Sequence, residues 1–126
     1  QIFGSSAETL KEASEYLCET VKPDIIDINM GCPVTKVAVK GHSGAALIKD
    51  TSKIEEIITT LVDSIPVPIT AKIRSGWDEK HINAVETAHI LEDAGASAIT
   101  IHPRTKMQEY KGKEDWNLIK KIKKGK

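Results

Sequence analysis

The sequence predicts an α/β fold made of parallel βα units, and three observations support this class. Short apolar segments of strand length alternate with longer segments of helical period, in the order βαβαβαβα. The predicted strands read as apolar on both faces, which is typical of parallel sheets covered by helices. No G-x-G-x-x-G motif follows a strand, which disfavours an open, doubly wound dinucleotide-binding sheet. A (β/α)8 TIM barrel has the same order, and four units would be about half of it, a partial TIM barrel.

The individual elements follow from the hydrophobic period and from capping and breaking residues. We expect strands at residues 2–4, 24–30, 67–73 and 98–101. We expect helices at residues 6–21, 44–49, 52–65 and 80–94, and a last one from residue 116 onward. The pairs Ser5 with Glu8 and Ser52 with Glu55 fit the capping-box pattern of a helix start. Gly95 is placed to end the helix at 80–94.

The helix at 52–65 has the clearest amphipathic pattern in the chain. Its apolar residues form one continuous stripe: Ile54, Ile57, Ile58, Leu61, Val62 and Ile65. A stripe of this kind predicts a helix that packs one face on the core.

Length and composition restrict the class of protein. The chain has 126 residues, the size of one domain, with 18 Lys and Arg against 18 Asp and Glu, so gross charge does not point to nucleic acid. Cys18 and Cys32 are too few for a disulfide framework or a zinc site, and no metal is expected. No apolar run approaches the ~20 residues of a membrane span, and no signal peptide is visible. We therefore expect a soluble cytoplasmic protein.

The two ends of the chain fall inside predicted elements. Gln1 lies within a strand pattern, and the last residues lie within a helical pattern. We therefore expect residues 1–126 to be a fragment of a longer barrel domain. Half a barrel exposes two sheet edges, so the fragment alone is expected to self-associate.

Polar residues collect where each predicted strand ends. They are Gln1 at the first, Asn29 and Cys32 at the second, Lys72 and Arg74 at the third, and His102 and Arg104 at the fourth. The carboxyl ends of parallel strands share one face, where ligand sites are built. Lys72 sits between apolar residues, and burying its ammonium is costly unless an anion or acceptor meets it. The pattern predicts a site for an anionic or electron-rich ligand.

These strand ends resemble a known family, the tRNA-dihydrouridine synthases. Residues 27–33, DINMGCP, are similar to that family's signature around its active cysteine. Residues 71–77, AKIRSGW, resemble its next strand end, residues 100–105, TIHPRT, the following one, and residues 1–5, QIFGS, the preceding one. The order and spacing match over nearly the whole chain.

The resemblance implies a fold and an activity. The family fold is an FMN-binding (β/α)8 barrel followed by a small helical RNA-binding domain, and the four strands here would be the third to sixth of that barrel. The implied reaction reduces uridine to 5,6-dihydrouridine in tRNA, with FMN reduced by NADPH. Two departures are small: His42 stands where the family usually has a small residue, and Pro103 follows the strand-end histidine.

The resemblance also implies roles by position. Cys32 matches the general acid that protonates C5 of the uracil, while the flavin hydride goes to C6. Three residues match those that hold the flavin ring and its ribityl chain: Gln1, Lys72 and His102. Asn29 matches a residue that contacts the target base, and Arg104 matches a motif position near the substrate.

The residue types suit this chemistry. A cysteine thiol, with an ordinary pKa of about 8.5, keeps its proton near neutrality and can donate it, whereas a nucleophilic cysteine needs a partner that stabilises the thiolate. The turn at residues 31–33, Gly-Cys-Pro, stops the strand and aims the thiol across the barrel mouth. A uridine stacked inside folded tRNA must be flipped out to reach such a pocket.

Other interpretations stay open. Cys32 also reads as a small core residue, Lys72 as a solvated strand-edge residue and His102 as a core histidine. Packing roles are expected for Cys18 and His89.

Two other functions also fit the sequence. One is a non-catalytic half-barrel that binds RNA or a partner. Lys36 and Lys40 fit contacts to tRNA phosphates and a solvated loop equally well. The other is a different FMN barrel that reduces free pyrimidines, although its local motifs match less well. The sequence leaves open which tRNA uridine is reduced and whether NADPH or NADH is the reductant.

Overall fold

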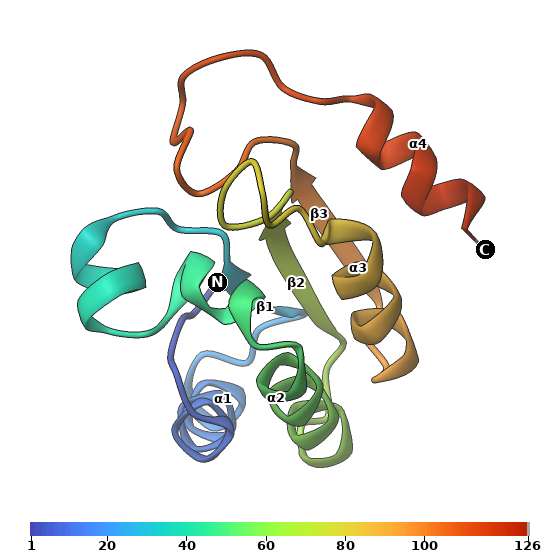
Figure 1. Cartoon of the computed structure of the whole chain (residues 1–126). Coiled ribbons are helices and arrows are strands. Elements are labelled where there is room, and N and C mark those ends of the chain that lie inside the picture. Colours follow the sequence, from blue (N-terminus) through green and yellow to red (C-terminus); the bar gives the residue numbers. More distant parts are fainter. Residues whose placement is uncertain (126) are drawn as a thin grey trace.

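The computed structural model describes residues 1–125, in which helices and strands alternate (Figure 1). Within these residues the α-helices are α1 (Ala7–Thr20), α2 (Thr51–Ser64), α3 (Ala84–Asp93) and α4 (Asn117–Lys124). The strands are β1 (Ile26–Met30), β2 (Ile69–Arg74) and β3 (Ala98–His102). Between β1 and α2 lie a π-helical turn, η1 (Lys36–Lys40), and a 3-10 helix, η2 (Gly44–Lys49). A helix long and apolar enough to cross a bilayer is absent from this part of the chain.

The strands form one parallel sheet in the order β1-β2-β3. The predicted strand at 2–4 is reduced to a single parallel bridge between Ile2 and Ile28. There, Ile2 N–H donates to the Asp27 carbonyl and Asn29 N–H donates to the Ile2 carbonyl. The parallel α/β class is confirmed, the expectation of four strands is only partly met, and the half-barrel stays a prediction.

The sheet has one apolar and one polar face, so the expectation that its strands are apolar on both faces was wrong. In β1, Ile26, Ile28 and Met30 are at most 3% exposed, whereas Asp27 and Asn29 between them are half-buried. Successive side chains of a strand point to opposite faces, so residues two apart share a face. The alternation is present in IDINM and ITAKIR, but the isoleucines dominate the mean hydropathy of such short runs and conceal it.

The helices lie on the apolar side of the sheet (Figure 1). Helix α2 buries Ile54, Ile57, Ile58 and Leu61 completely, as its stripe predicts. Val62 lies at the margin of that stripe and is 36% exposed. With the helices on one side only, the polar face is left for a site.

Three predicted helix starts differ from the structure. The N-cap of α1 is Ser6, whose Oγ accepts from Thr9 N–H at 3.3 Å, so the cap is not Ser5. The N-cap of α2 is Asp50, whose Oδ1 accepts from Lys53 N–H at 3.2 Å, so the cap is not Ser52. Helix α3 begins at Ala84 rather than at residue 80, because residues 75–83 form a loop that Asn83 anchors by donating to the Ile48 carbonyl at 2.7 Å.

Gly95 ends α3 as predicted. Its φ of 108° lies in the region that favours glycine. A Cβ there would approach Val62 Cγ1 to 3.0 Å, so the close packing of α2 on this turn also requires glycine.

Candidate active site at the carboxyl ends of the strands

The polar face of the sheet carries most of the predicted site residues. The register places Asn29 of β1 beside Lys72 of β2, and Lys72 beside Thr100 of β3. One step nearer the carboxyl ends, Arg74 stands beside His102. Neighbouring strands are about 4.8 Å apart, so these side chains are neighbours on one surface.

Gln1 joins this surface from the bridging segment. Its Nε2 donates to Asp27 Oδ2 at 2.5 Å, and its Oε1 accepts from Asn29 Nδ2 at 3.2 Å. Thr70 Oγ1 donates to the other oxygen of Asp27 at 2.7 Å. Because neutral donors engage both carboxylate oxygens, Lys72 is left as an exposed cation on the face.

The turn that carries Cys32 is fixed from three elements. Asn29 Oδ1 accepts from the N–H groups of Gly31 and Cys32, both at 2.9 Å. The Cys32 carbonyl accepts from Ala45 N–H at 3.0 Å, and Arg74 Nε donates to the Gly31 carbonyl at 2.7 Å. Cys32 is half-buried, and its thiol is free. The main chain of this residue therefore has little freedom to move.

Gly44 makes that close packing possible. A Cβ at this position would lie 2.9 Å from the Cys32 carbonyl oxygen and 3.0 Å from the Cys32 Cβ, and its φ of 55° also favours glycine. His42 has a φ of 50°, in the left-handed region, which histidine adopts more often than most non-glycine residues.

Arg74 connects the cysteine turn to the loop after β3. It is 2% exposed, and its Nη1 donates to the carbonyls of Thr105 at 3.0 Å and Glu109 at 2.7 Å. The Tyr110 ring lies 5.3 Å from its guanidinium carbon. Within residues 1–125 Arg74 has no carboxylate partner, and its burial lowers its pKa below the ordinary value of an arginine. Backbone carbonyls therefore hold this buried cation.

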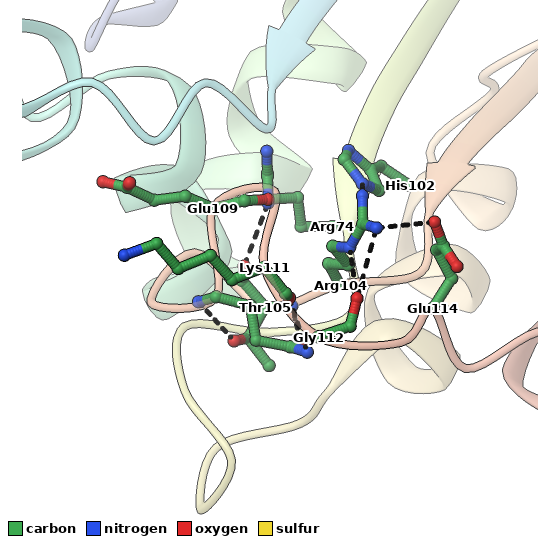
Figure 2. Close-up of polar contacts among 9 residues, drawn as sticks. Arg74, His102, Arg104, Thr105, Glu109, Lys111, Gly112 and Glu114 are labelled. Atoms are coloured by element: carbon green, nitrogen blue, oxygen red, sulfur yellow. Dashed lines mark hydrogen bonds and ion pairs between the residues drawn. The ribbon is translucent and has the colours of Figure 1, made fainter.

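His102 is held by an arginine that is itself paired (Figure 2). Arg104 Nη2 forms an ion pair with Glu114 Oε1 at 2.6 Å, and Arg104 Nη1 lies 3.2 Å from His102 Nε2. Arginine can only donate, so Nε2 accepts and the imidazole proton is on Nδ1. Burial lowers the pKa of His102, and the charges of Arg74, Arg104 and Lys72 lower it further. The ring is thus a neutral donor through Nδ1.

Lys72 is exposed, which corrects the expectation that the cost of burying its ammonium demands a ligand. The buried cation of β2 is Arg74, two residues later on the same face, because the loop after β3 covers it. The alternation of β2 places Lys72 and Arg74 on one face, but it does not show which of them the loop covers.

The sequence reasoning also missed Glu114, which lies ten residues beyond Arg104 in a loop without a motif. Cys18 packs against the core, as expected. Among residues 1–125, no three His, Cys, Asp or Glu side chains gather closely enough to hold a metal ion.

Comparison with known proteins decides the family. The family model described as "Dihydrouridine synthase (Dus)" matches residues 1–125. The chain belongs to the dihydrouridine synthase family. The resemblance seen at its strand ends is thereby confirmed.

Curated relatives agree with this assignment. The chain is 42% identical over 123 residues to tRNA-dihydrouridine synthase B of Vibrio vulnificus, a match that covers 98% of the chain and 38% of that protein. It is 46% identical over 123 residues to probable tRNA-dihydrouridine synthase 1 of Synechocystis, covering 98% and 34%. It is 38% identical over 124 residues to the probable tRNA-dihydrouridine synthase of Treponema pallidum, covering 94% and 36%. The chain thus spans about a third of the length of these relatives.

Proposed function

We propose that the protein reduces uridine to 5,6-dihydrouridine in tRNA, with FMN as cofactor, NADPH as reductant and Cys32 as proton donor. The observation that carries this is the fixed turn holding the Cys32 thiol, next to the polar face with Lys72 and His102, in a chain whose relatives are named tRNA-dihydrouridine synthases. In this proposal residues 1–126 are part of an FMN-binding (β/α)8 barrel that acts in the cytoplasm.

The polar face suits a flavin. The exposed ammonium of Lys72 has no ion-pair partner within residues 1–125, and a flavin ring that gains electrons gains negative charge, which a nearby cation stabilises. His102 offers a neutral N–H donor, and Gln1 offers an exposed amide. We assign flavin binding to these three residues.

Cys32 performs the proton transfer. When bound, FMN would supply the hydride for C6 of the uracil. The Cys32 thiol gives its proton to C5 and becomes a thiolate, which takes a new proton from water. Arg74, whose Nε donates to the neighbouring Gly31 carbonyl at 2.7 Å, holds a positive charge beside the turn that carries Cys32. Asn29 and Arg104 are assigned to the target base, which has to be flipped out of the tRNA stack.

The test is dihydrouridine formation by the protein at its natural length with FMN, NADPH and unmodified tRNA. A general acid contributes roughly 100- to 10,000-fold to rate, so Cys32→Ala should lose at least about 100-fold in kcat while flavin absorbance is retained. Cys18→Ala, which changes the chain's other cysteine, should keep its activity. Wild-type turnover in Cys32→Ala would refute the assigned role.

A module that binds RNA or a partner without chemistry is the second candidate. It is favoured by the openness of the polar face, where Gln1, Lys72 and Thr100 are all exposed. Flavin absorbance that co-purifies with the protein would exclude it. A different FMN barrel acting on free pyrimidines would instead turn over free uridine faster than tRNA.

A further inference from the structure

A cleft of about 520 Å³ lies beside the cysteine turn. It is lined by η2, by the loop after β2 and by the residues that precede α3: Ile48, Lys49, Trp77, Asp78, Lys80, His81, Ile82 and Asn83. Trp77 packs against the small cluster that contains Ala45, the residue whose N–H binds the Cys32 carbonyl. The Trp77 carbonyl also accepts from Met107 N–H at 3.0 Å. The indole is therefore fixed on the same rim as the cysteine turn, and we name this hollow with its lining the Trp77 cleft.

Two ammonium groups, one from the end of η2 and one from the loop after β3, lie over the Trp77 ring. Lys49 Nζ is 3.9 Å from a ring centroid, and Lys106 Nζ is 4.9 Å from it. Such cation–π contacts hold a lysine in place without neutralising its charge. Lys80, from a third segment, lines the same cleft. Two cations thus lie over one aromatic ring, and a third lines the same cleft.

Local carboxylates do not neutralise these cations. Within residues 1–125 neither Lys49 nor Lys106 forms an ion pair. Asp78 binds His81 Nδ1 at 2.6 Å and Lys80 N–H at 3.0 Å through the same oxygen. Asp50 caps α2. These hydrogen bonds leave the carboxylates charged, but the lining holds two lysines, Lys49 and Lys80, against the one carboxylate of Asp78. With Lys106 over the same indole, positive charge is in excess here.

We propose that the Trp77 cleft and its margin bind backbone phosphates of tRNA, with Lys49 of the lining and Lys106, which lies over the same indole, as the contacting residues. The inference rests on the proposed function and adds a position for the substrate. An ammonium is a good point-charge partner for a phosphate. The loops after β2 and β3 lie together at the carboxyl ends of these strands (Figure 1), joined by the hydrogen bond from Met107 N–H to the Trp77 carbonyl. The first of these loops lines the cleft. A tRNA whose uridine reaches Cys32 must cover this rim. Because the ammonium groups of Lys49 and Lys106 lie over the Trp77 ring, we expect them to contact phosphates and do not expect a base to stack on the indole.

The first test measures binding of an unmodified tRNA by the protein at its natural length over a series of salt concentrations. Removing one ammonium–phosphate interaction reduces the slope of log K against log salt by about 0.7 to 0.9. The double variant Lys49→Gln with Lys106→Gln should bind at least about fivefold more weakly at low salt, with a slope reduced by about one to two. Lys22→Gln, at the opposite rim before β1, makes the same kind of charge change and should bind like the wild type.

The second test observes the ring itself. In protein labelled with 5-fluorotryptophan, the Trp77 ¹⁹F signal, assigned by its loss in Trp77→Phe, should shift when tRNA is added. An unshifted Trp77 signal at saturating tRNA, or a double variant with the wild-type salt slope, would overturn the proposal.

Failure of this inference and failure of the proposed function give different results. Normal dihydrouridine formation together with an unshifted Trp77 signal would refute only phosphate binding at the Trp77 cleft. A shifted Trp77 signal and a reduced salt slope without any dihydrouridine formation would support phosphate binding at the cleft. The same result would refute the proposed reduction of uridine.

Discussion

Arg74 and Arg104 are neighbours with different sources of stabilisation. Arg74 is buried, and it is hydrogen-bonded to backbone carbonyls and to the Tyr110 side chain. Arg104 forms an ion pair with Glu114 and donates to His102 and to the Gly112 carbonyl (Figure 2). The first arginine therefore keeps a positive charge close to Cys32, and the second fixes the proton of a histidine. Two arginines that look alike in the sequence have separate roles.

His102 should titrate below the ordinary histidine pKa, because burial and three cations disfavour its charged form. The unfolded chain then takes up this proton first, so His102 lowers the stability of the folded state as pH falls below about 6.5. Arg104→Gln removes one cation and should raise the His102 pKa. Glu114→Gln removes the one opposing carboxylate and should lower it further. An NMR titration of the ring nitrogens, assigned with His102→Gln, measures both changes.

The opposite signs make this prediction specific. Both variants break the same ion pair, so mere loosening of the loop would move the pKa in the same direction in each. The ring nitrogen shifts should also report the Nδ1–H tautomer in the wild type. A wild-type ring protonated on Nε2 would contradict the hydrogen bond from Arg104.

The sequence located the site residues better than it described their surroundings. Asn29, Cys32, Lys72 and His102 were placed correctly at strand ends, because parallel strands bring their carboxyl ends together. Their partners depend on loops that return from elsewhere in the chain, and no local period encodes that return. Glu114 is the clearest case, since only the path of the loop after β3 brings it to Arg104.

At the scale of the element, helix starts were the weakest predictions. Ser52 and Glu55 fit the capping box, yet α2 begins one residue after Asp50. Asp50 has the extended backbone of an N-cap and reaches Lys53 N–H, whereas Ser52 already lies inside the helix. The capping-box pattern was present in the sequence but out of register with the helix by two residues.

Asp50→Ala should therefore destabilise the protein by about 1 kcal/mol, the usual loss when an N-cap acceptor is removed. Ser52→Ala should change the free energy of unfolding by less than about 0.5 kcal/mol, as for ordinary surface substitutions. Urea unfolding followed by circular dichroism compares the two. A larger loss for Ser52→Ala than for Asp50→Ala would restore the capping-box interpretation.

At the scale of the molecule, the class of fold was predictable and the extent of the sheet was not. Alternating strand and helix patterns identify parallel βα units, and the helices do gather on one side (Figure 1). The segment around Ile2 forms only one bridge, to Ile28. The length of a strand depends on the neighbouring strands that pair with it, and the local sequence does not specify them. The polar second face of the sheet was not predicted, because the isoleucines of the apolar face dominate the mean hydropathy of the short strands.

The unpaired edge of β3 should promote association of the isolated chain. The sheet ends at β3 in the described residues, so one side of this strand carries unpaired backbone groups. A hollow of about 420 Å³ lies beside it, with Ile99, Ile101, Ile119 and Ile122 in its lining. Unpaired strand edges next to apolar surface favour association with another chain.

We therefore expect the 126-residue chain alone to form dimers or larger species as its concentration rises, measured by light scattering after size exclusion. Thr100→Lys places a charge on the edge strand and should shift the population toward the monomer. Thr59→Lys, on the exposed side of α2, adds the same charge away from the edge and should leave the distribution unchanged. A wild-type chain that stays monomeric at every concentration would show that the β3 edge is protected, and an equal effect of both lysines would show that net charge rather than strand pairing controls the association.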